Sequence, residues 1–309
     1  MKTAARPVAD PALPGPVSGP VPARVPAPVR SERTAGAALV LGSVTSLQVG
    51  AALSSTLFPR IGAAGTTALR LVVAALLMLA VARPDVRRWS AYQWRSATLL
   101  GLALAGMNGL FYQALARVPL GVAVTVEFLG PLGLAVVLSR RPRDLLWVLA
   151  ALAGVVVLGT RHAAHGQALD TTGLLLAAGA GVFWAFYILA GARVAGSGTG
   201  RGGLSVATGM AALISLPVGV AGAGTRLLQP HTLAVGALVG LLASAIPYSC
   251  EIAALGRLPK KTFSVLLALE PAAAALAGVL LLGQSLPPAG LVGVALVVGA
   301  GVGSTLTAG

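Results

Sequence analysis

Residues 96–141 read SATLLGLALAGMNGLFYQALARVPLGVAVTVEFLGPLGLAVVLSRR, two apolar runs separated by Arg117-Val-Pro119 and closed by Arg140 and Arg141. Each run has about 20 residues, the length at which a helix rising 1.5 Å per residue crosses a ~30 Å hydrocarbon layer. A strand of a membrane barrel needs roughly half that length and alternates apolar with polar residues. The stretch therefore predicts two transmembrane helices joined by a short loop.

The same pattern repeats along the rest of the chain after Ala35. Short polar breaks separate apolar runs that are each long enough to span a bilayer as a helix. We therefore expect an all-α integral membrane protein with ten transmembrane helices, at residues 36–57, 63–83, 96–116, 120–139, 144–162, 171–193, 203–223, 232–255, 262–282 and 286–306.

The composition excludes several other classes of protein. Of 309 residues, 56% are hydrophobic and 10% are charged, whereas a soluble domain has about 25% charged residues. The net charge is +14, but aromatic residues make up only 5% and do not interleave with basic runs, so we expect no nucleic-acid partner. The one cysteine, Cys250, excludes an internal disulfide or a multi-cysteine metal site.

The basic residues test the ten-helix interpretation independently, because cytoplasmic loops of membrane proteins are rich in Lys and Arg. With the N-terminus inside, 17 of the 22 basic residues fall on the inner side. Only Arg60, Arg117, Arg161 and Arg226 fall outside, and Arg70 lies within a span. We therefore expect a multi-pass protein of the plasma membrane with both termini in the cytoplasm.

Residues 1–34 differ in composition from everything that follows. They hold eight of the twenty prolines and few large apolar side chains, so this leader is expected to be disordered and cytoplasmic. No apolar core with a small-residue cleavage site precedes the first span, which argues against a signal peptide.

An internal repeat is visible at an offset of 140 residues. Leu115-Ala-Arg117-Val-Pro119 matches Leu255-Gly-Arg257-Leu-Pro259, and Pro131 matches Pro271. The offset predicts two five-helix repeats, at 35–162 and 171–306, and because five is odd the second repeat enters the membrane inverted. Transporters built from inverted repeats bind substrate near the midplane, between the repeats.

Several motifs together resemble the EamA-type carriers of the drug/metabolite transporter superfamily, and among them the bacterial threonine/homoserine exporters. The resemblance covers nearly everything after residue 36. It is carried by Gly50-Ala-Ala-Leu-Ser-Ser-Thr-Leu-Phe-Pro59, Thr67-Ala-Leu-Arg70-Leu, Gly106-Met-Asn108-Gly-Leu-Phe-Tyr112, Val118-Pro-Leu-Gly-Val-Ala-Val-Thr-Val-Glu127-Phe-Leu-Gly-Pro131, Ser139-Arg-Arg-Pro142, Pro247-Tyr-Ser-Cys-Glu251 and Leu269-Glu270-Pro271-Ala. The chain departs from the family after Gly283, where Gln284 stands in place of the usual Glu.

The resemblance implies a secondary exporter of small amino acids, similar to threonine or homoserine, that works by proton antiport and alternating access. An exporter of aromatic metabolites or toxic cations is the alternative. We expect no cofactor. The sequence has no P-loop motif, which argues against ATP-driven pumping. An intramembrane enzyme is disfavoured because no Ser or Cys has a His at helical spacing. A scaffold without transport would have no need for acids inside the membrane.

Three acids lie deep in the expected spans, Glu127, Glu251 and Glu270. An ionisable side chain at this depth is costly, which favours a role in binding a substrate ammonium or carrying protons. The alternative is a neutral or paired Glu that ties helices together. Glu270 precedes Pro271, so it has the further option of satisfying backbone groups there.

Other polar and aromatic residues are expected around the same pocket. Asn108 and Tyr112 are four residues apart, so they share one face of a helix. Tyr248 and Glu251 are three residues apart and share a face of another helix. Trp184 and Tyr187 offer an aromatic wall, with core packing or interfacial anchoring as alternatives. The remaining candidates are Phe111, which the repeat aligns with Glu251, and Gln48.

Arg70 is the one basic residue expected inside a span, about 10 Å from its end. It has three options: binding a substrate carboxylate, extending to the outer headgroups, or capping carbonyls that prolines leave free. Pro131, Pro247 and Pro271 free the carbonyls of Glu127, Ala243 and Leu267, so they predict weakened helices beside the acids. His162, His165 and His231 do not form a metal-binding pattern, and we expect no metal site.

Overall fold

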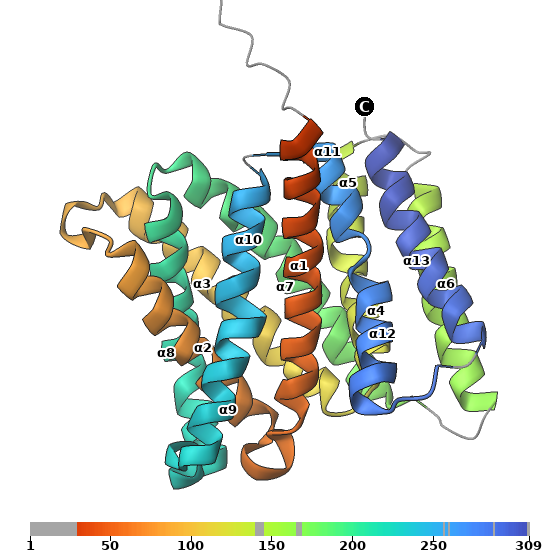
Figure 1. Ribbon diagram of the computed structural model, residues 1–309, viewed down its shortest axis with the longest axis horizontal. Helices are drawn as coiled ribbons and strands as arrows, with labels where there is room; N and C mark the ends of the chain where they lie inside the picture. Colours follow the sequence, from red (N-terminus) through yellow and green to blue (C-terminus); the bar gives the residue numbers. More distant parts are fainter. Residues whose placement is uncertain are drawn as a thin grey trace, which may run out of the picture.

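The computed structural model describes residues 30–139, 145–164, 169–255, 257–258, 260–286 and 288–307, and within these ranges it contains helices and no strand. Figure 1 shows the helices lying side by side in one bundle, with the C-terminus at the end where α1 begins. This confirms the all-α architecture expected from the sequence.

Seven of the ten expected spans are single helices, and α2 has a kink at Gly62 (φ 67°, ψ 171°), one residue before the expected span 63–83 begins. Their bounds lie within a few residues of the predicted ones, except that α1 begins at Arg30, inside the segment predicted to be a disordered leader; residues 1–29 of that leader lie outside the described ranges. The seven helices are α1 (Arg30–Ser55), α2 (Phe58–Ala82), α3 (Ala91–Leu115), α6 (Leu145–Ala164), α7 (Thr171–Gly196), α8 (Gly200–Ala223) and α13 (Pro288–Thr307).

The other three spans are broken helices, and each break lies close to one of the prolines singled out above. The expected span 120–139 divides into α4 (Leu120–Glu127) and α5 (Leu129–Ser139). The span 262–282 divides into α11 (Lys260–Leu267) and α12 (Glu270–Leu282). The span 232–255 consists of α9 (Pro230–Gly240), a π-helical turn at Leu241–Ala245, and α10 (Ile246–Leu255).

Local capping signals set several helix starts. Ser90 and Gln93 form a reciprocal capping box at the start of α3, and the Asp170 carboxylate accepts from Thr172 N–H at 2.7 Å at the start of α7. Pro59 and Pro230 stand in the first turns of α2 and α9, where their missing N–H leaves no intrahelical bond unmade.

The helices meet the requirements of a bilayer. In the described residues seven stretches are long and apolar enough to span a membrane, and three shorter apolar helices, Leu120–Ala135, Leu145–Val157 and Gly290–Ser304, correspond to the remaining expected spans. Large apolar side chains also face outward, for example Leu213 and Leu280, each 69% exposed. An outward apolar surface of this kind is stable against lipid and unfavourable in water.

The contacts between helices follow a symmetric plan. α7 packs against α4 and α5, just as α1 packs against α11 and α12. α3 packs against α7 as α10 packs against α1, and three contacts pair equivalent spans directly: α2 with α8, α6 with α13, and α4 with α12. This is the packing that two inverted five-helix repeats require, although the repeat boundaries at 35–162 and 171–306 stay a prediction.

Candidate functional site

A cavity of about 590 Å³ lies in the middle of the bundle, a size suited to a small-molecule ligand. Its walls come from α1, α2, α3, α4, α5, α7, α10, α11, α12 and α13, with the segment at Leu241–Ala245. Toward one end it reaches Leu138 near the end of α5 and Phe263 near the start of α11. Toward the other it ends at Ala51 and Tyr112, inside the bundle.

The structure brings every site residue predicted from the sequence to this one cavity. They come from separate helices, and their shared location agrees with a binding site while leaving their roles as predictions. The lining includes Gln48, Arg70, Asn108, Phe111, Tyr112, Glu127, Trp184, Tyr187, Tyr248, Glu251 and Glu270.

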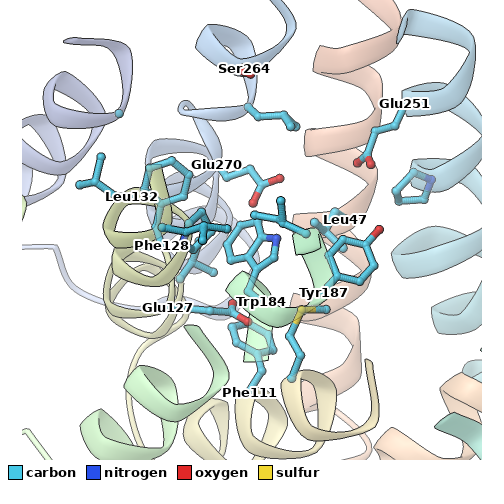
Figure 2. Close-up of a pocket in the computed structure, with 18 of the residues that line it drawn as sticks. Leu47, Phe111, Glu127, Phe128, Leu132, Trp184, Tyr187, Glu251, Ser264 and Glu270 are labelled. Carbon is cyan, nitrogen blue, oxygen red and sulfur yellow. The ribbon is translucent and has the colours of Figure 1, made fainter. Parts of the chain in front are cut away.

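The three carboxyls enter the cavity from different elements, as Figure 2 shows. Glu251 on α10 accepts a hydrogen bond from the Ser43 hydroxyl of α1 at 2.9 Å. Glu127 and Glu270 are 8% and 5% exposed, and within the described ranges their carboxyls form no hydrogen bond or ion pair. The Glu270 carboxylate points into the cavity beside the ring of Trp184 rather than back to its own backbone, so the backbone role considered for it is not observed.

Helix breaks place two of these acids. Glu127 is the last residue of α4. Pro131, four residues later, has no N–H to donate to the Glu127 carbonyl. Gly181 of α7 packs on this break so closely that an added Cβ would lie 2.5 Å from the Glu127 carbonyl oxygen. Glu270 is the first residue of α12, followed by Pro271, and α11 ends at Leu267. The prolines thus interrupt the helices at the depth of these two carboxyls.

Arg70 is buried in the wall of the cavity, 5% exposed. Its Nε donates to the Ser244 hydroxyl at 3.2 Å, one Nη donates to the Asn108 side-chain oxygen, and the other to the Ala243 carbonyl. Ala243 is the residue whose carbonyl Pro247 leaves free, so the capping role expected as one option is realised. Extension to the headgroups is not, because the guanidinium is held inside the bundle.

Aromatic rings close the end of the cavity at Ala51 and Tyr112, opposite Leu138 and Phe263. The Tyr112 ring lies 5.2 Å from the Arg70 guanidinium carbon, in a cation–π arrangement, and its hydroxyl is 3.0 Å from that of Ser54. Phe58 and Phe111 contact Tyr112 edge to face. Trp184 packs edge to face on Phe128. These contacts pack the rings against one another and against Arg70 and Ser54.

Five serines that the sequence reasoning did not single out take part in the site. Ser43, Ser54 and Ser244 hold Glu251, Tyr112 and Arg70, while Ser264 and Ser304 line the cavity directly. The repeat offset was a usable signal for one of them, because Ser264 aligns with Val124 and both line the cavity. The others carry no motif that separates them from ordinary helix serines.

The comparisons with known proteins agree with this architecture. The model of the EamA-like transporter family matches residues 171–306. Threonine/homoserine exporter RhtA of Escherichia coli (strain K12) is 42% identical over 272 residues, which cover 87% of this chain and 90% of that protein. The chain belongs to the EamA-like transporter family. It is therefore a multi-pass membrane transporter of the drug/metabolite transporter superfamily.

Two further proteins resemble this EamA-like transporter at lower sequence identity. Uncharacterized transporter YwfM of Bacillus subtilis (strain 168) is 27% identical over 219 residues, covering 68% of this chain and 72% of that protein. A solved crystal structure matches with a TM-score of 0.56 and 24% identity, covering 88% of this chain and 97% of that chain. The latter likeness shows a shared fold.

Gln284, where this EamA-like transporter departs from the family pattern, has a defined structural role. Gly283 ends α12 in the left-handed region at φ 62°, and the Gln284 side-chain oxygen then accepts from the Leu120 N–H at 3.1 Å, at the start of α4. The amide oxygen thus caps one of the unpaired N–H groups of α4, which a carboxylate would also do.

We expect Gln284→Ala to lower the free energy of unfolding by about 1 kcal/mol, because it leaves this N–H without its partner. Gln284→Glu keeps an acceptor and adds a favourable charge at a helix N-terminus, so its stability should equal or exceed that of the parent. Thermal unfolding in detergent compares the three proteins. Equal stability of the parent and the Ala variant would show that the cap does not contribute.

Metal-binding clusters are not found among the described residues, where no group of three or more His, Cys, Asp or Glu side chains is close enough to hold an ion. His231 is 2.9 Å from the Arg60 guanidinium through its Nδ1. His165 lies outside the described ranges, as does the side chain of His162. Cys250 is a free, partly buried thiol.

Proposed function

We propose that this protein exports small amino acids of the threonine/homoserine type across the bacterial plasma membrane, by proton antiport and alternating access. The observation that carries the proposal is one cavity within the bundle that is lined by a guanidinium and three carboxyls. A zwitterionic amino acid needs a cation for its carboxylate and an anion for its ammonium, and this cavity offers both. The relatives named as threonine/homoserine exporters support the same substrate class.

The proposed coupling uses a carboxyl that binds either the substrate ammonium or a proton. Glu127 and Glu251 are the candidates, with Glu270 as a third carboxyl in the same space. Glu127 is within electrostatic range of both Arg70 and Glu270. A proton arriving from outside would neutralise the carboxylate and release the ammonium, and its loss to the cytoplasm would restore the binding state.

Alternating access is supported by the asymmetry of the cavity between its two ends. At the outer end α4 and α12 pack together, with an added Cβ at Gly121 lying 2.8 Å from the Ala275 Cα. At the inner end the lining continues to Leu138 and Phe263, next to the Arg- and Lys-rich segments that we assign to the cytoplasm together with both termini. In the proposed cycle this structure would be the conformation closed to the outside.

The two halves would exchange these conformations in the proposed cycle. The repeat offset pairs residues across the cavity, Asn108 with Tyr248 and Phe111 with Glu251, and all four line it. A site between inverted repeats can open to either side when one half rocks against the other.

An exporter of aromatic metabolites or toxic cations is the second candidate. The aromatic wall formed by Phe111, Tyr112, Trp184 and Tyr187 favours it, as does the excess of three carboxyls over one guanidinium.

Labelled efflux from lipid vesicles tests the proposal. Vesicles containing the purified protein are loaded with labelled threonine or homoserine, and efflux is followed with the outer solution acidic, equal or alkaline relative to the lumen. Proton antiport predicts the fastest efflux with the outer solution acidic, because protons then enter as substrate leaves. Efflux that ignores the gradient would contradict the coupling. Efflux of an aromatic amine but of neither amino acid would select the second candidate.

A further inference from the structure

Arg70 is an unusual buried cation, because it forms no ion pair in the part of the chain that the structure describes. Its three hydrogen bonds all go to neutral acceptors, and within the described ranges no carboxylate lies within ion-pair distance of it, although three carboxyls line the same cavity. A buried charge without a counter-ion is costly to maintain. The fold accepts this cost at a position facing the cavity.

The geometry of these bonds leaves part of the guanidinium available. A guanidinium has five N–H donors, and the three bonds to Ser244, Asn108 and Ala243 use one on each nitrogen. One N–H therefore remains on each Nη. A carboxylate oxygen can accept a charge-assisted hydrogen bond from such an N–H group. The three existing bonds and the Tyr112 ring hold the guanidinium in one orientation, so little side-chain entropy is lost on binding.

Gln48 is a second polar residue of the wall with an unmet requirement. It is 3% exposed, on α1 next to Leu47, and its side-chain oxygen has no hydrogen-bond partner. An unsatisfied buried acceptor destabilises the empty protein. Rotation about the terminal torsion, which is broad for an amide, turns either of its polar atoms to the cavity. A ligand with a hydroxyl supplies the missing donor.

From these two observations we infer that Arg70 binds the α-carboxylate of the transported amino acid and that Gln48 binds its side-chain hydroxyl. The inference rests on the proposed function and deepens it, because it defines the substrate as a free amino acid with a short hydroxylated side chain. The ammonium is then left to the carboxyls. Aromatic side chains are not selected by either contact.

Three ligands separate the two contacts. Threonine has both groups, threonine methyl ester lacks the carboxylate charge, and 2-aminobutyrate lacks the hydroxyl of both threonine and homoserine. Isothermal titration of the purified protein in detergent gives the affinity for each. The parent should bind threonine roughly 100-fold more tightly than the ester, which loses a charged hydrogen bond to Arg70. It should bind threonine about 10-fold more tightly than 2-aminobutyrate, which loses a weaker, neutral hydrogen bond to Gln48.

The Arg70→Gln variant should bind threonine as weakly as the ester, with affinity for the ester unchanged. The unchanged ester affinity shows that the variant is folded, and Arg60→Gln, at an exposed arginine on the outer side, is the matched control. A purely structural Arg70, needed only to cap Ala243, would weaken threonine and ester equally. That result, or intact discrimination in the variant, overturns the assignment of Arg70.

Gln48→Met keeps the length of the side chain and removes both polar atoms. It should bind threonine and 2-aminobutyrate equally, without loss of affinity for 2-aminobutyrate, while Gln229→Met at an exposed position should match the parent. Equal weakening of both ligands, or preserved discrimination, overturns the assignment of Gln48. A parent protein that binds none of the three ligands would instead contradict the proposed function.

Discussion

Glu127→Gln is expected to abolish the acceleration of threonine efflux by an acidic outer solution, reducing gradient-driven efflux roughly tenfold or more. Gln has nearly the same shape as Glu but can neither take up a proton nor carry a negative charge. The Glu127 carboxyl forms no hydrogen bond within the described ranges, so the substitution breaks no contact there and should leave the fold intact.

We propose Glu127 as the coupling residue because of its position. It ends α4, the half-helix proposed to close the outer end, and it is within electrostatic range of Arg70. In the proposed cycle a change in its charge would act on both the gate and the bound amino acid. Glu251, by contrast, is already engaged by Ser43.

Equilibrium exchange separates coupling from binding. With equal pH on both sides, exchange of labelled for unlabelled threonine needs no net proton movement. Glu127→Gln should therefore retain exchange at a threonine concentration high enough to offset the weaker binding of the ammonium, while it loses gradient-driven efflux. Glu32→Gln, at an exposed position in the first turn of α1, is the control. Gradient-driven efflux that survives in Glu127→Gln but is lost in Glu251→Gln would move the coupling role to Glu251.

Most of the fold was predictable because bilayer thickness fixes helix length and basic loops fix the count of crossings. The breaks at Pro131, Pro247 and Pro271 were also predictable as weak points, since proline removes a backbone donor wherever it stands. Their form was not, because a π-helical turn at Leu241–Ala245 in one span and a separation into two helices in the others depend on what packs against them.

The candidate site was predictable to the extent that polar groups in a membrane are rare. Glu127, Arg70 and Asn108 stand out in apolar sequence, and they do line one cavity. The partners of Arg70 could not be inferred, because Ser244 and Ala243 lie 174 and 173 residues away and only the packing of α2 against the Leu241–Ala245 segment joins them. Helix periodicity shows which residues share a face of one helix. It does not show which other helix packs against that face.

Gly121→Val is expected to hold the outer end of the cavity open. The added Cβ would lie 2.8 Å from the Ala275 Cα, a backbone atom that cannot move aside without separating α4 from α12. Overpacking of this kind costs about 1–3 kcal/mol, and because it acts on the closed contact alone it would change the closed-to-open ratio roughly 5- to 150-fold.

The measurement is labelling from outside by a membrane-impermeant maleimide, with Cys250→Ser as background and a cysteine placed at Val124 in the cavity wall. Gly121→Val should raise the labelled fraction and slow efflux, because a carrier that cannot close one side cannot complete its cycle. Gly133→Val on α5 is the matched control, since no atom lies within 4 Å of an added Cβ there.

The two variants together decide whether the α4–α12 contact is a gate or only a packing contact. A gate predicts increased labelling with a melting temperature close to that of Gly133→Val, because the strain is relieved by opening rather than by unfolding. A packing contact predicts lower thermal stability with unchanged labelling in the remaining folded protein. A gate here would also explain why a glycine stands at position 121: a residue without a Cβ lets the closed contact between α4 and α12 form without strain.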